Sequence, residues 1–158
     1  MKWSFVPDSD KFIDGVISAV AEKEGDAYNP VYIHGSSYDL GALIHRFENE
    51  YLKRSHDASI CRISGNDFYN RYITAVKGGE AQDAVISSPL CDMLIFENID
   101  AIAGNAGLMQ LFCRLFDRVY ASGGKIIIGG LRLPQSIPAL AGRVRTRLDC
   151  GIVCDLAG

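Results

Sequence analysis

Short apolar runs and longer segments of helical periodicity alternate along the chain, and this alternation limits the possible fold more than any other feature. The apolar runs are typical of buried strands and lie at residues 31–34, 59–63, 93–96, 126–128 and 152–154. The segments of helical periodicity lie at residues 10–24, 42–53, 67–77, 108–119 and 139–148. The pattern predicts an α/β fold in which helices cover a five-stranded parallel sheet.

Size and charge restrict the functional classes. A chain of 158 residues is expected to form one domain, and 16 Lys and Arg against 19 Asp and Glu produce no field that would attract nucleic acid by itself. No apolar run approaches the ~20 residues of a membrane-spanning helix, and the first residues do not resemble a secretory signal. We therefore expect a cytoplasmic protein with no membrane partner.

The cysteines and histidines follow no metal-site or disulfide pattern. The five cysteines, an odd number, are scattered at Cys61, Cys91, Cys113, Cys150 and Cys154, and the three histidines stand alone. A zinc site needs clustered pairs, and a disulfide framework needs an even set at regular spacing. We expect no metal ion and reduced, mostly buried thiols.

Ligands of open α/β sheets bind beyond the carboxyl ends of the strands, and three segments deserve inspection on that ground. The first has the length and glycine placement of a phosphate-binding loop and consists of Gly35, Ser36, Ser37, Tyr38, Asp39, Leu40, Gly41 and Ala42. It lacks the Lys-[Ser/Thr] pair that holds phosphates and magnesium, and Asp39 adds a negative charge. The segment is either a weakened anion site at a helix N-terminus or only a turn.

The second segment follows the predicted strand at 93–96. Glu97 and Asp100 are carboxylates that could hold magnesium or orient an attacking water, whereas Asn98 cannot act as a general base. The alternative is that these carboxylates are merely solvated or cap a helix.

The third segment is a basic stretch within the predicted helix at 139–148. Leu140, Val144 and Leu148 share the core face, which puts Arg143 and Arg147 together on a flanking side and Arg145 on the far side. Two arginines one turn apart suit a phosphate group. A solvated basic helix face is the alternative.

Taken in order, these segments resemble the AAA+ ATPase core of the bacterial replication-initiator family, DnaA and its shorter paralogue Hda. The clearest match is AYNPVYIHG at 27–35, which is similar to the family's A-Y-N-P-L-F-I-Y-G before Walker A. DMLIFENID at 92–100 resembles the Walker B strand D-V-L-L-I-D-D-I-Q, and LAGRVRTRL at 140–148 resembles the arginine-finger segment L-E-D-R-L-R-S-R-F. The resemblance implies a three-layer α/β/α fold of the P-loop NTPase type.

The departures from the family pattern fall on the nucleotide-binding positions. They are Gly41 and Ala42 at the Walker A Lys and Thr, Glu97 and Asn98 at the Walker B acids, residues 129–131 at sensor 1, and residues 6–8 near adenine. Every element that would bind or hydrolyse the chain's own nucleotide is changed. We therefore expect a pseudo-ATPase without catalytic residues in cis and without a nucleotide cofactor.

The arginine-finger segment, by contrast, is retained. The resemblance aligns Arg147 with the finger and Arg143 with the arginine one turn earlier. It implies a regulatory partner in replication initiation that docks on a DnaA-type initiator or another AAA+ replication protein, or associates with itself. The family's lid and helix-turn-helix domain are expected to be absent, since the sequence stops after the last predicted strand.

Two alternative functions remain. One is a weak ATPase in which Glu97 holds magnesium and residues 35–42 cradle phosphate, with ATP or ADP bound. The other is a single-stranded DNA module, because the family's DNA path corresponds here to a region that contains Arg62, Tyr69, Arg71, Tyr72 and Lys77. Aromatic side chains interleaved with cations could stack bases and neutralise phosphates, although the tyrosines could equally belong to the core.

Overall fold

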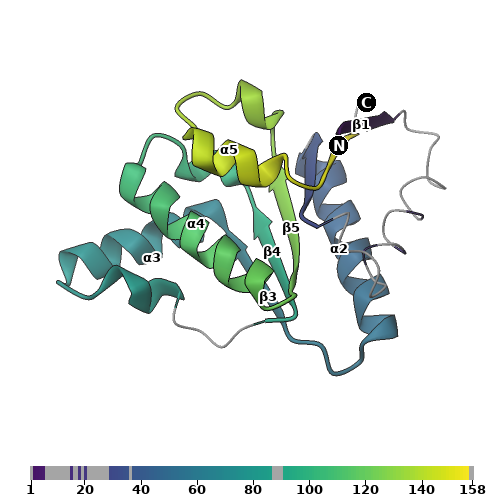
Figure 1. Ribbon diagram of the computed structural model, residues 1–158, viewed down its shortest axis with the longest axis horizontal. Coiled ribbons are helices and arrows are strands. Elements are labelled where there is room, and N and C mark those ends of the chain that lie inside the picture. The colour runs from purple at the N-terminus through teal and green to yellow at the C-terminus, as the bar shows by residue number, and fades with distance from the viewer. Residues whose placement is uncertain are drawn as a thin grey trace.

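The computed structural model describes residues 2–5, 15, 18, 20, 29–35, 37–86 and 91–156, and it contains a six-stranded parallel sheet (Figure 1). The strands are β1 (Lys2–Phe5), β2 (Val31–Gly35), β3 (Ile60–Ser64), β4 (Met93–Glu97), β5 (Lys125–Gly130) and β6 (Ile152–Leu156). Their order across the sheet is β1-β6-β2-β5-β4-β3, and each pair of neighbours is parallel. The α/β class and the five predicted strands are confirmed.

The sheet has one strand more than the sequence pattern predicts. β1 pairs with β6, so that Lys2 lies opposite Val153 and Phe5 opposite Leu156. Four residues without a longer periodic pattern give little strand signal, and the partner strand lies near the other end of the sequence. Only the folded chain brings the two segments together.

Four helices are described in full, together with three 3-10 turns. The helices are α2 (Ser37–Arg54), α3 (Gly65–Lys77), α4 (Ala106–Ala121) and α5 (Gly142–Leu148), and the turns are Gln82–Ile86, Ile99–Ile102 and Pro134–Ser136. The predicted helix over 10–24 lies outside the described residues except for Gly15, Ser18 and Val20, which are helical. None of the helices in these ranges is long and apolar enough to cross a lipid bilayer.

Two predicted helix starts were wrong. α2 begins at Ser37 rather than at residue 42, and α5 begins at Gly142 rather than at residue 139. Before α5, Ala139 has a left-handed φ of 60° and Ala141 is extended, so the backbone turns into the helix only after these residues. The apolar periodicity of this stretch therefore continues beyond the helix itself.

Side-chain caps fix the starts of the two helices that follow β3 and the turn at 99–102. The Ser64 hydroxyl accepts the backbone N–H of Asp67 at 3.1 Å, and the Asn105 side chain accepts that of Leu108 at 3.0 Å. Each cap satisfies one of the N–H groups that a helix leaves unpaired at its first turn. α3 and α4 thus begin at residues whose side chains favour a helix start.

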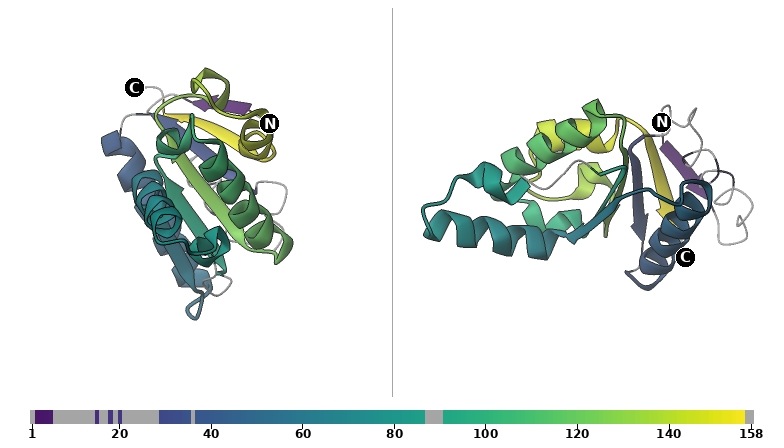
Figure 2. Two further views of the ribbon diagram at one scale, coloured as in Figure 1. Left: turned by 90° about the vertical axis from the view of Figure 1, so that its left-hand side faces the viewer. Right: turned by 90° about the horizontal axis from the view of Figure 1, so that it is seen from below.

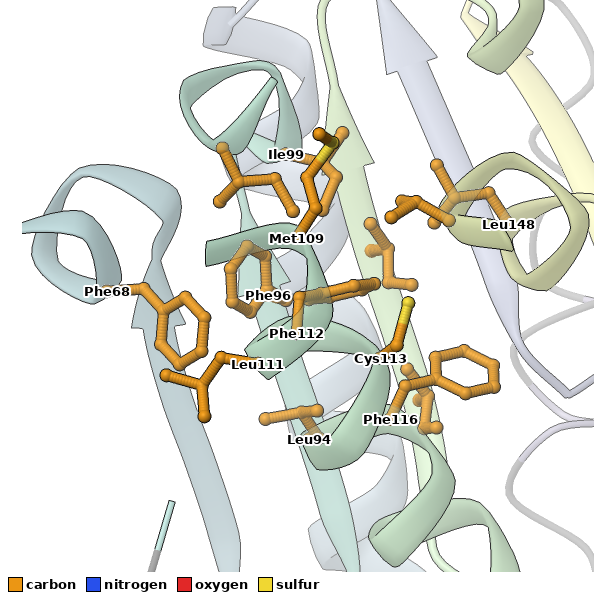
Figure 3. Close-up of a cluster of buried hydrophobic side chains, with 14 of the residues drawn as sticks. Phe68, Leu94, Phe96, Ile99, Met109, Leu111, Phe112, Cys113, Phe116 and Leu148 are labelled. Carbon is orange, nitrogen blue, oxygen red and sulfur yellow. The ribbon is translucent and has the colours of Figure 1, made fainter. Parts of the chain in front are cut away.

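The helices form a layer on each face of the sheet, as Figure 2 shows in two further views. Leu94, Phe96, Ile126 and Ile128 face the core cluster that includes α3, α4 and α5, whereas Met93, Ile95 and Ile127 face the cluster that includes α2. In the larger cluster the ring of Phe96 lies 4.9 Å from that of Phe112 and 5.4 Å from that of Phe68 (Figure 3). Burial on both faces explains why these strands are continuous apolar runs.

A buried asparagine joins the beginning of β2 to the beginning of β5. The Asn29 side-chain Nδ2 donates to the carbonyl of Gly124 at 2.9 Å, and its Oδ1 accepts the backbone N–H of Ile126 at 2.8 Å. Gly151 approaches from the other side, where a Cβ would lie 1.9 Å from the carbonyl oxygen of Pro30. The Asn29-Pro30 pair in the AYNP segment therefore has a structural role in the sheet.

We predict that Asn29→Ala lowers the free energy of unfolding by about 2–4 kcal/mol, because it leaves the Gly124 carbonyl and the Ile126 N–H buried without their partner. Urea denaturation monitored by circular dichroism measures the change. Asn70→Ala on the exposed surface of α3 is the matched control and should stay within about 0.5 kcal/mol of the parent. Equal stabilities of the two variants would contradict the structural role of Asn29.

Candidate functional site

The first turns of α2 and the carboxyl ends of β4 and β5 border a cavity of about 330 Å³, which we call the nucleotide-like cavity. It is lined by Leu40, Gly41, Ile44, Glu97, Asn98, Gly130 and Leu131. Apart from Ile44, these residues belong to the predicted phosphate loop, the Walker B strand end and the sensor 1 position. The structure thus brings together three segments that the sequence pointed to separately.

The segment expected to form a phosphate loop is largely helical. β2 ends at Gly35 and α2 begins at Ser37, so Gly41 and Ala42 lie in the second turn of the helix rather than at its start. Ser36 and the side chains of Ser37, Tyr38 and Asp39 lie outside the described part of the structure. The predicted strand–loop–helix is therefore corrected: the chain passes from strand to helix with almost no loop between them.

Apolar side chains occupy the floor of this cavity. Leu40 is buried, and its Cδ2 would lie 3.0 Å from a Cβ placed on Gly129, while the Ile44 Cδ1 would lie 3.4 Å from it. Leu131, at the last sensor 1 position, exposes 52% of its surface. Leucine and isoleucine side chains cannot donate a hydrogen bond to a phosphate. An anion that lost its water in this cavity would gain nothing from these side chains in return, so they disfavour anion binding.

Glu97 is held by an arginine from the neighbouring strand. Arg62 of β3 donates to the Glu97 Oε1 from Nε at 2.9 Å and from Nη2 at 2.5 Å, and its Nη1 lies 3.4 Å from the Glu48 Oε2 of α2. A magnesium ion at Glu97 would have to compete with this guanidinium. Sequence reasoning named Arg62 and Glu97 for different roles. The parallel register of β3 and β4, which sets Ser64 beside Glu97, brings the two side chains together only in the folded chain.

Asn98 and Asp100 shape the turn that follows β4. Asn98 adopts a left-handed conformation, φ 55° and ψ 60°, which asparagine tolerates better than most residues. Its carbonyl oxygen lies 2.1 Å from where a Cβ of Gly65 would be, so residue 65 must be glycine for this approach. The Asp100 Oδ1 accepts the backbone N–H of Leu131 at 2.9 Å and thereby fixes the segment after β5.

Arg147 forms a two-point ion pair with Asp117 of α4. Its Nε and Nη2 donate to the Asp117 Oδ1 and Oδ2 at 2.8 and 2.7 Å, and its Nη1 donates to the carbonyl of Arg143 at 2.8 Å. The hydrogen bonds from Arg147 lower the pKa of Asp117, and those to Asp117 raise the pKa of Arg147. Sequence reasoning missed Asp117, because no local pattern on α4 marks it as a partner of α5.

The other two arginines of α5 differ in exposure, and Arg145, expected on the far side from the core, is half-buried. Val144 and Leu148 are buried, and Arg143 is exposed one turn before Arg147, with its Nη2 3.5 Å from the carbonyl of Ala106. Arg145 is half-buried and donates from Nη2 to the carbonyl of Leu140 at 3.2 Å. Arg143 and Arg147 therefore form one basic edge of α5, separate from the nucleotide-like cavity.

The predicted DNA-binding residues divide into two groups. Tyr69, Arg71 and Lys77 are exposed on α3. Tyr72 is 9% exposed, and its hydroxyl lies 2.1 Å from where a Cβ of Gly107 would be, so this tyrosine belongs to the core between α3 and α4. Its predicted DNA contact is therefore corrected, and the Arg62 guanidinium is already engaged by Glu97 and Glu48.

Two structures of replication initiators have the same fold. The chain superposes on domain III of the Thermotoga maritima DnaA protein with a TM-score of 0.82 at 21% identity, over 96% of this chain and 63% of that one. It superposes on a replication initiator DnaA bound to AMPPCP and single-stranded DNA with a TM-score of 0.79 at 23% identity, over 94% and 47% of the two chains. These likenesses establish a shared fold.

Comparison of sequences identifies the family. Residues 4–155 match the bacterial DnaA ATPase domain. The chromosomal replication initiator protein DnaA of Thermomicrobium roseum is 31% identical over 140 residues, which cover 87% of this chain and 30% of that protein. The sequence thus spans about a third of the length of the relatives it matches. From the arrangement of the strand ends and from these matches, we conclude that the chain belongs to the bacterial DnaA ATPase domain family.

Proposed function

We propose that this DnaA-family domain hydrolyses no nucleotide of its own and acts as a regulatory partner of an initiator-type AAA+ ATPase during the initiation of chromosomal replication. The observation that carries the proposal is the pairing of Glu97 with Arg62 beneath a helical Walker A segment. A side chain that would hold magnesium is neutralised by the chain itself. Arg147, which is retained, would then act as an arginine finger on the nucleotide of a neighbouring ATPase.

The missing Walker A lysine allows an estimate of how much weaker nucleotide binding should be. Each charge-assisted hydrogen bond to a buried anion contributes ~1.5–3 kcal/mol, so the missing Walker A lysine alone weakens binding by about one to two orders of magnitude. Leu40 and Ile44 line the cavity, and Asn98, which stands where the family has an acid, cannot act as a general base. Together these changes support a domain without catalytic activity in cis.

We predict that ATP or ADP with magnesium binds no more tightly than a Kd of about 1 mM, as measured by calorimetric titration of the full chain. The physical reason is that the described residues lining the cavity include no cation, and their one carboxylate, Glu97, is paired with Arg62. Micromolar binding that disappears in Glu97→Gln would instead establish a live, lysine-free nucleotide site. In that case the weak-ATPase alternative would replace the pseudo-ATPase proposal.

The hydrogen bonds of Arg147 leave part of its guanidinium available to a second anion. Of the five N–H groups of an arginine, Nε–H and one on Nη2 bind Asp117, and one on Nη1 binds the Arg143 carbonyl. Within the part of the chain that the structure describes, one N–H on Nη1 and one on Nη2 remain. Asp117 therefore orients the side chain without using up its capacity to bind a phosphate of a neighbouring nucleotide.

We predict that Arg147→Ala removes the stimulation of ATP turnover that this chain gives to an initiator ATPase with intact Walker motifs. Arginine fingers supplied in trans contribute up to ~10³–10⁵ in rate in the best-known systems. Phosphate release is measured with the partner at fixed concentration and this chain titrated. Asp117→Asn should lower the stimulation less than Arg147→Ala, because the guanidinium stays but loses its orienting charge.

The control for this experiment is Arg54→Ala, which removes an exposed arginine at the end of α2, on the other face of the sheet. It should stimulate as the parent does, and circular dichroism checks that all variants fold. Equal stimulation by the parent and Arg147→Ala would exclude an arginine finger.

Single-stranded DNA is a second candidate partner. One structurally similar initiator holds single-stranded DNA, and Tyr69, Arg71 and Lys77 are each exposed on α3 of this chain. Aromatic side chains stack on bases in a sequence-tolerant manner, and the two cations can neutralise phosphates. The contact would not need the nucleotide-like cavity.

For this candidate we predict that fluorescence anisotropy with a labelled oligothymidylate detects binding that weakens steeply with added salt. Tyr69→Ala should cost about 1–3 kcal/mol of binding free energy through the lost stacking. Tyr120→Ala is a closely matched control, since Tyr120 on α4 is 42% exposed against 41% for Tyr69. Binding that both variants lower equally, or that ignores salt, would argue against a DNA path along α3.

A further inference from the structure

A second cavity, of about 190 Å³, is lined by residues of β3, β4, α3, α4 and the turn at 82–86 (Figure 1). It shares no lining residue with the nucleotide-like cavity. The arginine edge of α5 also lies outside it. The chemistry of this second cavity is therefore separate from the elements on which the regulatory role was proposed.

Apolar side chains form most of the wall of the second cavity. They come from four separate elements and include Ile63, Ile86, Leu94, Leu115 and Val119. An engineered apolar cavity of about 150 Å³ in another protein binds benzene, so the volume here suits an apolar body of about six carbon atoms. Among the described residues that line it none is aromatic, so the second cavity offers no stacking surface for a nucleic-acid base.

Two guanidinium groups that line the second cavity pair with no carboxylate of the described residues. Arg118 of α4 donates from Nη1 to the carbonyl of Ile86 at 2.8 Å, which holds its side chain beside the cavity. Arg71 lines the same cavity from α3 and is exposed. A third arginine of the lining, Arg62, is already engaged by Glu97. Arg71 and Arg118 thus provide two positive charges that a ligand could neutralise.

Apolar walls combined with two guanidinium groups favour a ligand that is both apolar and anionic. Small-molecule sites are mostly apolar, and a few convergent polar groups fix the orientation of the ligand. A guanidinium matches a carboxylate with two parallel hydrogen bonds. A phosphate ester has a charge of about −2 near pH 7, and this charge costs more to desolvate beside apolar walls than the single charge of a carboxylate. The second cavity therefore suits a carboxylate better than a phosphate.

We propose that the second cavity is a binding site for a small carboxylate with an apolar body of about six carbon atoms. The apolar body packs against Leu94 and Leu115, and the carboxylate binds Arg71 and Arg118. The site is independent of the proposed regulatory role, which rests on Arg147 and the nucleotide-like cavity. Arg71 also belongs to the candidate DNA surface of α3, but the apolar walls do not, so a dependence of binding on the apolar body separates the two.

The test titrates the full chain with hexanoate and follows its backbone amide signals by NMR. Hexanoate should shift the signals of Cys61, Leu94 and Leu115, and it should bind at least about tenfold more tightly than acetate, which lacks the apolar body, or hexanol, which lacks the charge. Affinity equal to that of either control, or no shift at these residues, would overturn the proposal. Tighter binding of hexyl phosphate than of hexanoate would overturn the assignment to a carboxylate.

A variant locates the carboxylate. Arg71→Ala should weaken hexanoate binding about tenfold and leave hexanol binding unchanged, because only hexanoate carries a charge. Arg114→Ala is the matched control, since Arg114 is exposed on α4 one turn before Arg118 and does not line the second cavity. Equal hexanoate affinities of the parent and Arg71→Ala would overturn the proposed contact. The comparison of probes uses the parent chain, so it decides the proposal even if a variant fails to fold.

Discussion

The burial of β5 on both of its faces is the constraint on which the other elements depend. All six of its residues are buried, between β2 and β4, with α2 on one side and α4 on the other. Asn29 fixes where the strand begins, and its end has no side chains: a Cβ on Gly130 would lie 2.1 Å from the Tyr32 hydroxyl. Because Gly129 and Gly130 have no side chains, Leu40 and Tyr32 can pack against the end of the strand from opposite faces. Leu40 and Gly130 then line the nucleotide-like cavity.

The changed residues of that cavity are compatible with one another. A carboxylate at Glu97 without a bound metal needs a counterion, and Arg62 supplies it from the adjacent strand. A strand end without polar groups needs apolar cover, and Leu40 supplies it from a helix that starts where a loop was expected. Arg62 neutralises the charge of Glu97, and Leu40 covers the strand end, so neither group depends on a bound nucleotide and its metal ion. The charged and apolar groups of the cavity are therefore paired or covered by the chain itself, which supports the proposed domain that hydrolyses no nucleotide of its own.

Much of the fold was readable from the sequence, because buried strands and one-sided helices each have a characteristic period. The exceptions have particular causes. β1 needed its partner β6, which is remote in sequence. The start of α2 was misplaced because the length and glycine placement of the segment favoured a loop, while the burial of Leu40 and Ile44 favours a helix. In the site, residue types indicated which positions mattered but not their pairing: Arg62 with Glu97, Arg147 with Asp117 and Tyr72 with Gly107 are contacts between separate elements. A single sequence carries no direct signal for such pairs.

The left-handed turn at Asn98 also bears on how the domain could change over generations. Aspartate tolerates the same backbone conformation, so one substitution could return an acid to this position without moving the chain. The helical Walker A segment offers no comparable route, because a lysine placed at Gly41 would stand in the second turn of a helix whose buried Leu40 covers the strand end. Under the proposed function, the departures from the family pattern thus differ in how easily they could be reversed. A side-chain change at Asn98 could be reversed by one substitution, whereas the helical backbone at Gly41 could not.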